Sequence, residues 1–197
     1  MGAIPYSTRV RPDTGLTNGR LGTALFLLSE VMFYGGLFSA YVFLRSSATE
    51  WPAAGVPIPR GMGIAALVLQ FAAAAAVFMA WMRIRKDSRS SVIALSLGTA
   101  IAATGFIAII AVQQRMLISE STVAATSTYH AVYFLIADIH RLHVAVGAIL
   151  AAYMMGPGRT LQLRDSMAYA NRVTCIAWYW LFLAAAWAVT FALFHTV

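Results

Sequence analysis

Five long runs of apolar residues, separated by short polar segments, form the pattern along the chain. The runs are about Leu21–Leu44, Met62–Met82, Val92–Val112, His130–Met155 and Val173–Phe194. Each run is long enough to cross roughly 30 Å of hydrocarbon as a helix. None has the alternation of a barrel strand, and a helix satisfies its own backbone hydrogen bonds without water. The pattern predicts an all-α, polytopic membrane helix bundle with five transmembrane helices.

Composition narrows the class of protein. Of the 197 residues 60% are apolar and 11% are charged, and the mean hydropathy is +0.74. These values exclude a soluble enzyme domain, a disordered chain and a secreted disulfide framework. Residues 1–20 are polar and lack the apolar stretch of a signal peptide, so we expect a cytoplasmic N-terminal arm. Residues 21–197 are then expected to form a single transmembrane domain.

The basic residues predict the orientation of the bundle. The net charge is +7, and ten basic residues fall in the arm and in the second and fourth loops, against three on the opposite side. Because positive charge is retained on the cytoplasmic side, we expect the N-terminus inside and the C-terminus outside. Short basic loops of this kind suit lipid phosphates and do not favour a nucleic-acid partner.

Glu30 lies near the centre of the first run, where a carboxyl group must be protonated, paired or in a wet cavity. Tyr34 and Tyr41 share its helical face and could hydrogen-bond it. Two interpretations stay open: a proton-related or lipid-facing carboxyl group, and a neutral acid held by hydrogen bonds. Gly22 and Gly36 lie on another stripe, which predicts close approach of a neighbouring helix.

The fourth run carries four ionisable side chains within six residues: Asp138, His140, Arg141 and His143. Asp138 and Arg141 are three residues apart and can form an intramembrane ion pair. His140 and His143 are also three apart and lie on a different face of the helix. Because both polar stripes are costly in lipid, we expect protein to enclose both.

Metal binding and catalysis are alternative roles for these polar residues. Glu30, His140 and His143 could in principle hold a metal, but no Glu-x-x-His pair or second ligand helix accompanies them. The central histidines all lie on one run, which disfavours haem with two axial histidines. The single cysteine, Cys175, is expected to be a small buried apolar residue. We therefore predict no catalytic centre and no metal site in this chain.

Aromatic side chains gather in the first loop and in the last run. Trp51 stands in a proline-rich loop, and the last run contains Tyr179, Trp180 and Trp187. Tryptophan and tyrosine are enriched where membranes meet water. These residues are therefore expected to combine an aromatic belt with helix packing.

Four segments resemble motifs of one family, in the family's order. Residues 27–38, LLSEVMFYGGLF, resemble the first helix of the short, five-helix form of haem–copper oxidase subunit III, which reads Ser-Glu-Val-Met-Phe-Phe there. The family's Trp-Pro, His-Gly-Leu-His-Val and Tyr-Trp-His-Phe motifs are similar to Trp51-Pro52, to residues 140–144 and to residues 179–182, the last followed by Trp187.

The resemblance implies an accessory, non-redox subunit III of a cytochrome c oxidase-type terminal oxidase in aerobic respiration. Such a subunit packs with oxidase subunits I and II, which carry the haem and copper, and holds membrane phospholipids in a cleft. It keeps the catalytic subunit's proton uptake and oxygen access in order. Glu30 matches the family's membrane-buried carboxylate, and His140 and His143 match its paired histidines. The expected location is the inner membrane of a bacterium, in a respiratory complex or a larger supercomplex.

The sequence departs from the family pattern at four positions. Asp138 and Arg141 replace two glycines near the first histidine, and Leu181 and Ala184 replace a His and an Asp of the last helix. Since the glycines become the two halves of an ion pair, we hypothesise that a polar network has moved from the last helix to the fourth. Replacing Arg141 alone should then disturb assembly more than replacing Arg141 and Asp138 together.

Two alternatives stay open beside the oxidase subunit. A subunit III-like partner of a nitric oxide reductase or another terminal oxidase would share these motifs. A small proton-coupled transporter would use Glu30, Asp138 and the histidines as a relay, but broken helices and internal repeats are not evident. Purification with haem-bearing partners would distinguish a subunit from a transporter.

Overall fold

The computed structural model of the protein describes residues 16–52, 58–84, 89–120, 127–156 and 165–196. The regular elements in these segments are α-helices: α1 Asn18–Ser46, α2 Arg60–Ile84, α3 Arg89–Glu120, α5 Thr128–Met155 and α7 Ser166–His195. Each of the five is long and apolar enough to cross a membrane. The prediction of an all-α fold with five membrane-spanning helices is confirmed.

Two helices extend well beyond the apolar runs that predicted them. α3 continues past Val112 to Glu120, and α7 begins at Ser166, before the apolar run itself. A hydropathy pattern marks the part of a helix that suits hydrocarbon, whereas the backbone ladder continues into the polar interface. Asp165 starts α7 as an N-cap, because its side chain accepts a hydrogen bond from the Ala168 amide at 2.9 Å.

The predicted arm, residues 1–20, lies mostly outside the described residues, and α1 already begins at Asn18. The side chain of Thr17 caps this helix by accepting a hydrogen bond from the Arg20 amide at 3.3 Å. The Thr17 hydroxyl also donates to the Asn171 side chain of α7 at 2.6 Å. The beginning of α1 is therefore tied to α7.

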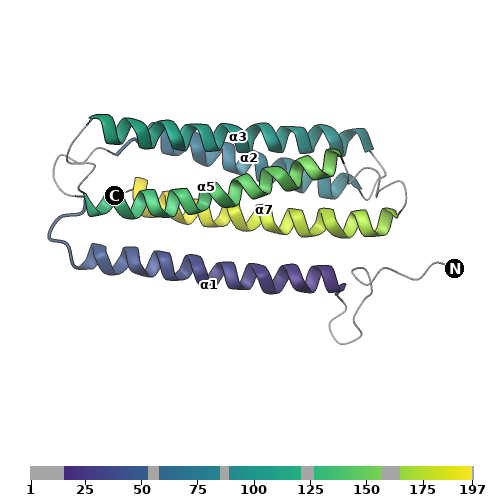
Figure 1. Ribbon diagram of the computed structural model, residues 1–197, viewed down its shortest axis with the longest axis horizontal. Helices are drawn as coiled ribbons and strands as arrows, with labels where there is room; N and C mark the ends of the chain where they lie inside the picture. Colours follow the sequence, from purple (N-terminus) through teal and green to yellow (C-terminus); the bar gives the residue numbers. More distant parts are fainter. Residues whose placement is uncertain (1–15, 53–57, 85–88, 121–126, 157–164, 197) are drawn as a thin grey trace.

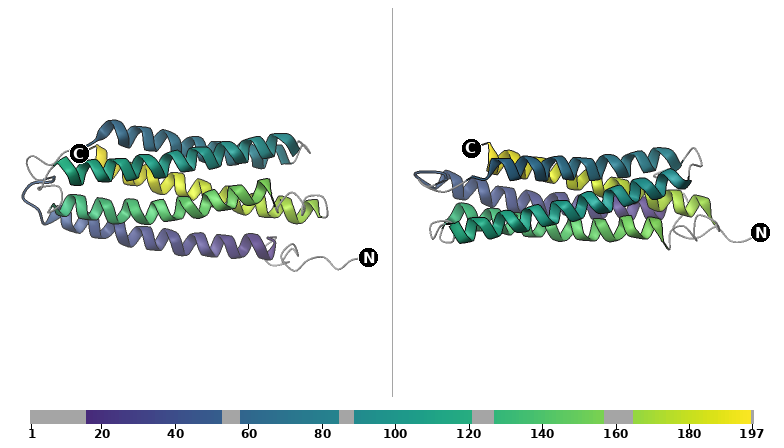
Figure 2. Two further views of the ribbon diagram at one scale, coloured as in Figure 1. Left: turned by 45° about the horizontal axis from the view of Figure 1, so that its top comes forward. Right: turned by 90° about the horizontal axis from the view of Figure 1, so that it is seen from above.

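Helices α2, α3, α5 and α7 form a ring in which each helix packs against the next, and α1 lies outside this ring along α7 (Figure 1). The further views show the same elongated arrangement of nearly aligned helices (Figure 2). The start of α1 and the end of α7 lie at opposite ends of the bundle (Figure 1). An inside N-terminus and an outside C-terminus fit this arrangement, and that orientation stays a prediction.

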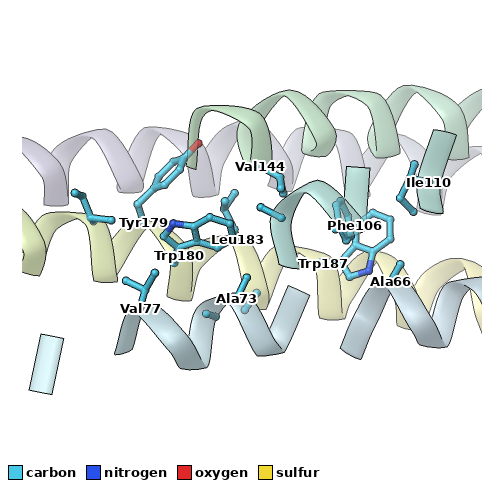
Figure 3. Close-up of a cluster of buried hydrophobic side chains, with 14 of the residues drawn as sticks. Ala66, Ala73, Val77, Phe106, Ile110, Val144, Tyr179, Trp180, Leu183 and Trp187 are labelled. Atoms are coloured by element: carbon cyan, nitrogen blue, oxygen red, sulfur yellow. The ribbon is translucent and has the colours of Figure 1, made fainter. Parts of the chain in front are cut away.

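The core fills the centre of the ring (Figure 3). Trp180 and Trp187 of α7 and Phe106 of α3 are completely buried. The rings of Phe106 and Trp187 meet edge to face with their centroids 4.8 Å apart. Small residues of α2, such as Ala66 and Ala73, are buried beside them and let the helices approach closely. The two tryptophans thus serve packing and do not form a belt at the membrane surface.

Two glycines give large side chains of α7 the room they need. A Cβ added at Gly147 of α5 would lie 2.8 Å from the Trp180 ring, closer than real Cβ atoms approach. A Cβ added at Gly63 of α2 would overlap the ring of His195. Glycine at these two positions therefore sets how closely α5 and α2 approach α7.

The glycines of α1 have a different environment. Gly22 and Gly36 are exposed, and a Cβ at either position would meet no atom within 4 Å beyond the helix's own backbone. Among the described residues no helix of this chain packs on this stripe, and the close approach of a neighbouring helix there stays a prediction. Instead, α1 contacts the ring through its opposite face, where Tyr34 and Tyr41 are buried.

Candidate functional site

An acid from α1 and a histidine from α5 meet between the two helices. Oε2 of Glu30 lies 3.0 Å from Nε2 of His143, and both side chains are mostly buried. On its other side, Nδ1 of His143 lies 2.8 Å from the carbonyl oxygen of Ile139. The partner that sequence reasoning did not find for Glu30 is thus a histidine, supplied by a different helix.

Hydrogen-bond chemistry determines the charge of this pair. A carbonyl oxygen only accepts, so the hydrogen bond to Ile139 requires a proton on Nδ1 of His143. One further proton then lies between Nε2 and the carboxyl group of Glu30. Whether that proton resides on the imidazole or on the acid, the pair has no net charge. This explains how Glu30 is accommodated at membrane depth.

His140, the other predicted histidine, has a different partner. The Tyr34 hydroxyl lies 3.0 Å from Nδ1 of His140, which is completely buried against Phe106 and Trp187. The edge of the Tyr34 ring also packs against His143, with centroids 5.7 Å apart. Tyr34 therefore connects the acid–histidine pair to the core.

The hydrogen bonds of the two tyrosines go to other partners. Tyr34, which could have bonded Glu30, instead forms a hydrogen bond with His140. Tyr41 donates to the carbonyl oxygen of Leu193 at 2.5 Å and receives a hydrogen bond from Nε1 of Trp51 at 3.2 Å. Tyr41 and Trp51 thus join the first loop and α1 to the end of α7.

A cleft of about 550 Å³ opens beside this site between α1, α5 and α7. Its walls are mostly apolar, and the lining residues include Phe26, Val146, Ile176, Tyr179, Cys175 and Arg172. Tyr179 forms one end of the cleft and donates a hydrogen bond from its hydroxyl to the carbonyl oxygen of His143 at 2.9 Å. Figure 3 shows its ring pointing away from the core toward α5.

The opposite end of the cleft is cationic. Arg172 is exposed there, and its guanidinium donates to the Tyr153 hydroxyl and lies 5.7 Å from the centroid of the Tyr153 ring. Cys175, one turn further along α7, is partly exposed to the cleft. The prediction that Cys175 is buried is therefore wrong, because its face of α7 borders the space between α1 and α5.

A second polar group lies between α3 and α5. Oδ1 of Asp138 accepts from the Arg141 guanidinium at 2.7 Å and from the Gln114 amide at 2.9 Å. Arg141 also donates to the Gln114 carbonyl oxygen at 3.1 Å. We call these three side chains the Gln114 network. The structure thus brings Asp138 and Arg141 together, and it adds Gln114, which sequence reasoning missed because it lies on another helix.

The two residues of the last helix that differ from the family pattern line an apolar groove. Leu181 and Ala184 of α7 face this groove together with Phe71 and Phe78 of α2. Within the described part of the chain, no group of three His, Cys, Asp or Glu side chains is placed to hold a metal ion. In particular, Glu30 forms a hydrogen bond with His143, whereas His140 forms one with Tyr34.

Comparison with known proteins identifies the family. The family model for cytochrome c oxidase subunit III matches residues 12–196. The chain therefore belongs to the cytochrome c oxidase subunit III family.

Individual relatives support this assignment. A probable cytochrome c oxidase subunit 3 from Mycobacterium bovis is 27% identical over 182 residues, which cover 90% of this chain and 87% of the relative. A cytochrome c oxidase subunit 3 from Thermostichus vulcanus is 24% identical and covers 89% and 85% of the two chains. A haem–copper oxidase subunit I+III from Aeropyrum pernix is 24% identical over 88% of this chain, which spans 22% of that longer protein.

Proposed function

We propose that this chain, an accessory subunit of a cytochrome c oxidase, holds a phospholipid in the cleft between α1, α5 and α7. The Glu30–His143 pair beside the cleft supports proton uptake by the catalytic subunit, and the apolar cleft supports its oxygen access. The observation that carries the proposal is the cleft itself, which leads from an arginine at one end to the neighbourhood of the acid–histidine pair.

The chemistry of the cleft fits a phospholipid. Arg172 stands at the end of α7 that the charge pattern predicts to be cytoplasmic, where it can bind a headgroup phosphate. Aliphatic and aromatic side chains such as Val146, Ile176 and Phe26 line the remainder, which suits an acyl chain. A charged end followed by an apolar wall along a membrane helix matches the two parts of a phospholipid.

The Glu30–His143 pair fits a role in proton handling. It holds one proton that can reside on either partner, and it remains neutral in both forms. Tyr179 joins the pair to the cleft, because its hydroxyl binds the carbonyl oxygen of His143. A proton entering along headgroups at the cleft would therefore meet an exchangeable acid at its inner end.

The proposed setting is a respiratory complex in a bacterial inner membrane. Oxidase subunits I and II are the proposed partners and carry the haem and copper. The charge pattern of the loops and the five apolar helices support a multi-pass position among anionic lipids. A larger supercomplex is a further proposed assembly of the same partners.

The experiment purifies the complex through a tag on this chain and compares Cys175→Trp with Val189→Trp. Cys175 lines the cleft, whereas Val189 is exposed elsewhere on α7, so only the first tryptophan fills the cleft. We expect haem to accompany all variants, and Cys175→Trp alone to lose phospholipid phosphorus per haem and to inactivate after fewer turnovers.

Three results would contradict the proposal. An unchanged phospholipid content in Cys175→Trp would show that the lipid does not bind in this cleft. A tagged chain that is stable alone and colourless would favour the transporter alternative, whereas co-purification with a nitric oxide reductase would favour the other complex.

A further inference from the structure

The Gln114 network lies on the outward side of α3 and α5 at membrane depth. Asp138 and Arg141 fall in the middle third of α5, which has 28 residues. A helix of that length is about 42 Å long, against roughly 30 Å of hydrocarbon. The ion pair therefore belongs to the part of α5 that is long and apolar enough to span the membrane.

Protein of this chain covers the network only in part. The side chain of Asp138 is 47% exposed and that of Arg141 is 29% exposed. Both recorded hydrogen-bond partners of Asp138 bind Oδ1, so among the described residues Oδ2 is left without a donor. Lipid tails offer no donor, and an unsatisfied carboxylate oxygen in hydrocarbon is strongly unfavourable.

The charges and the surroundings of the network indicate what covers it. One acid and one base cancel, so a charged group brought to this face would lack a counterion. Leu135 and Leu142 flank Asp138 one turn away on either side and are 54% and 68% exposed. The face thus offers apolar contact around one unused hydrogen-bond acceptor.

We propose that this face docks against a transmembrane helix of another subunit of the oxidase. That helix presents a neutral donor, a hydroxyl or an amide side chain, to Oδ2 of Asp138. None of the three residues of the Gln114 network lines the lipid cleft. The proposal therefore does not depend on the cleft or on the acid–histidine pair.

The first test replaces the network and measures assembly of the full complex. Asp138→Leu combined with Arg141→Leu removes both charges, and Thr104→Leu is the matched control at an exposed position of α3. We expect the double variant to lower the haem recovered per tagged chain by about threefold or more, because the partner's donor is left unpaired. Arg141→Leu alone should lower it further, since Asp138 then lacks its counterion, and Thr104→Leu should leave it unchanged.

The second test keeps the native network and reports what touches it. A photo-crosslinking amino acid at Leu142 is activated in native membranes, and the product is identified by mass spectrometry. A covalent product with another oxidase subunit supports the proposal, even if the double variant fails to fold. Products with only lipid or with a second copy of this chain would overturn it, as would full haem recovery in the double variant.

Discussion

At the scale of single residues, the environment of Glu30 explains how this chain carries an acid through a membrane. The carboxyl group shares one proton with His143, and the second nitrogen of that histidine is fixed by the Ile139 carbonyl. The imidazole therefore cannot turn away without losing a hydrogen bond. A neutral pair with a movable proton is less costly in hydrocarbon than an isolated carboxylate.

Substitutions at this pair should separate structure from proton handling. In Glu30→Gln the amide donates to Nε2 of His143, so the free energy of unfolding should change by less than about 0.5 kcal/mol. In His143→Leu the acid loses its partner, and stability should fall by about 1–3 kcal/mol. Thermal unfolding of the purified complex measures both.

Oxygen uptake provides the functional measurement on the same variants. Glu30→Gln has no exchangeable acid, so we expect slower oxygen consumption at an unchanged content of haem. If Glu30→Gln instead keeps the native rate, the pair has a structural role only.

The sequence predicted which residues are unusual but not all of their partners. Helical periodicity places Tyr34 and Tyr41 on the face of Glu30, and it correctly sets Asp138 beside Arg141, because these relations stay within one helix. The bonds from Glu30 to His143 and from Gln114 to Asp138 join different helices. Such pairs depend on how helices pack, which the pattern along one helix does not contain.

At the scale of helices, α5 has three distinct faces. One face places His140 in the core, another brings His143 to α1, and a third presents the Gln114 network. α5 can approach α7 because Gly147 leaves room for the ring of Trp180. A change of one methyl group at that position should therefore alter the packing of the two helices.

Gly147→Ala should destabilise the bundle by about 1–3 kcal/mol, because the new Cβ would overlap the Trp180 ring. Gly98→Ala is the matched control, since it adds a Cβ in open space on α3 and should be neutral or slightly stabilising. Melting temperatures of the detergent-solubilised chain compare the two. Equal melting temperatures would show that Trp180 moves aside without cost.

The number and positions of the helices were predictable, because about 20 apolar residues have one favoured conformation in hydrocarbon. The ends were less predictable. α3 continues through Gln113 and Gln114, polar residues that end an apolar run without ending a helix. Both are buried against neighbouring helices, which a hydropathy pattern does not register.

At the scale of the whole molecule, α1 differs from the other helices. Four helices form the ring, whereas α1 lies outside it along α7 (Figure 1), and only Tyr34 and Tyr41 of α1 are buried. The cleft and the acid–histidine pair both lie between α1 and the ring. The proposed lipid and proton functions thus depend on α1, the helix that has the fewest buried residues among those described.

The orientation of the whole molecule has a direct test. The ten basic residues of the arm and the even-numbered loops predict an inside N-terminus. Alkaline phosphatase fused after the last residue should be active, because that enzyme folds outside the cytoplasm. A green fluorescent protein inserted in the loop between α2 and α3 should be fluorescent. The opposite pair of results would show that the bundle has the reverse orientation in the membrane.

The contact between His195 and Gly63 has a practical consequence for anyone who labels this protein. The imidazole of His195, in the last turn of α7, packs against the backbone of α2 at Gly63. A label attached directly after α7 would strain the contact between His195 and Gly63 and loosen the last turn of α7. A flexible linker of several glycines and serines would keep a bulky label away from this contact.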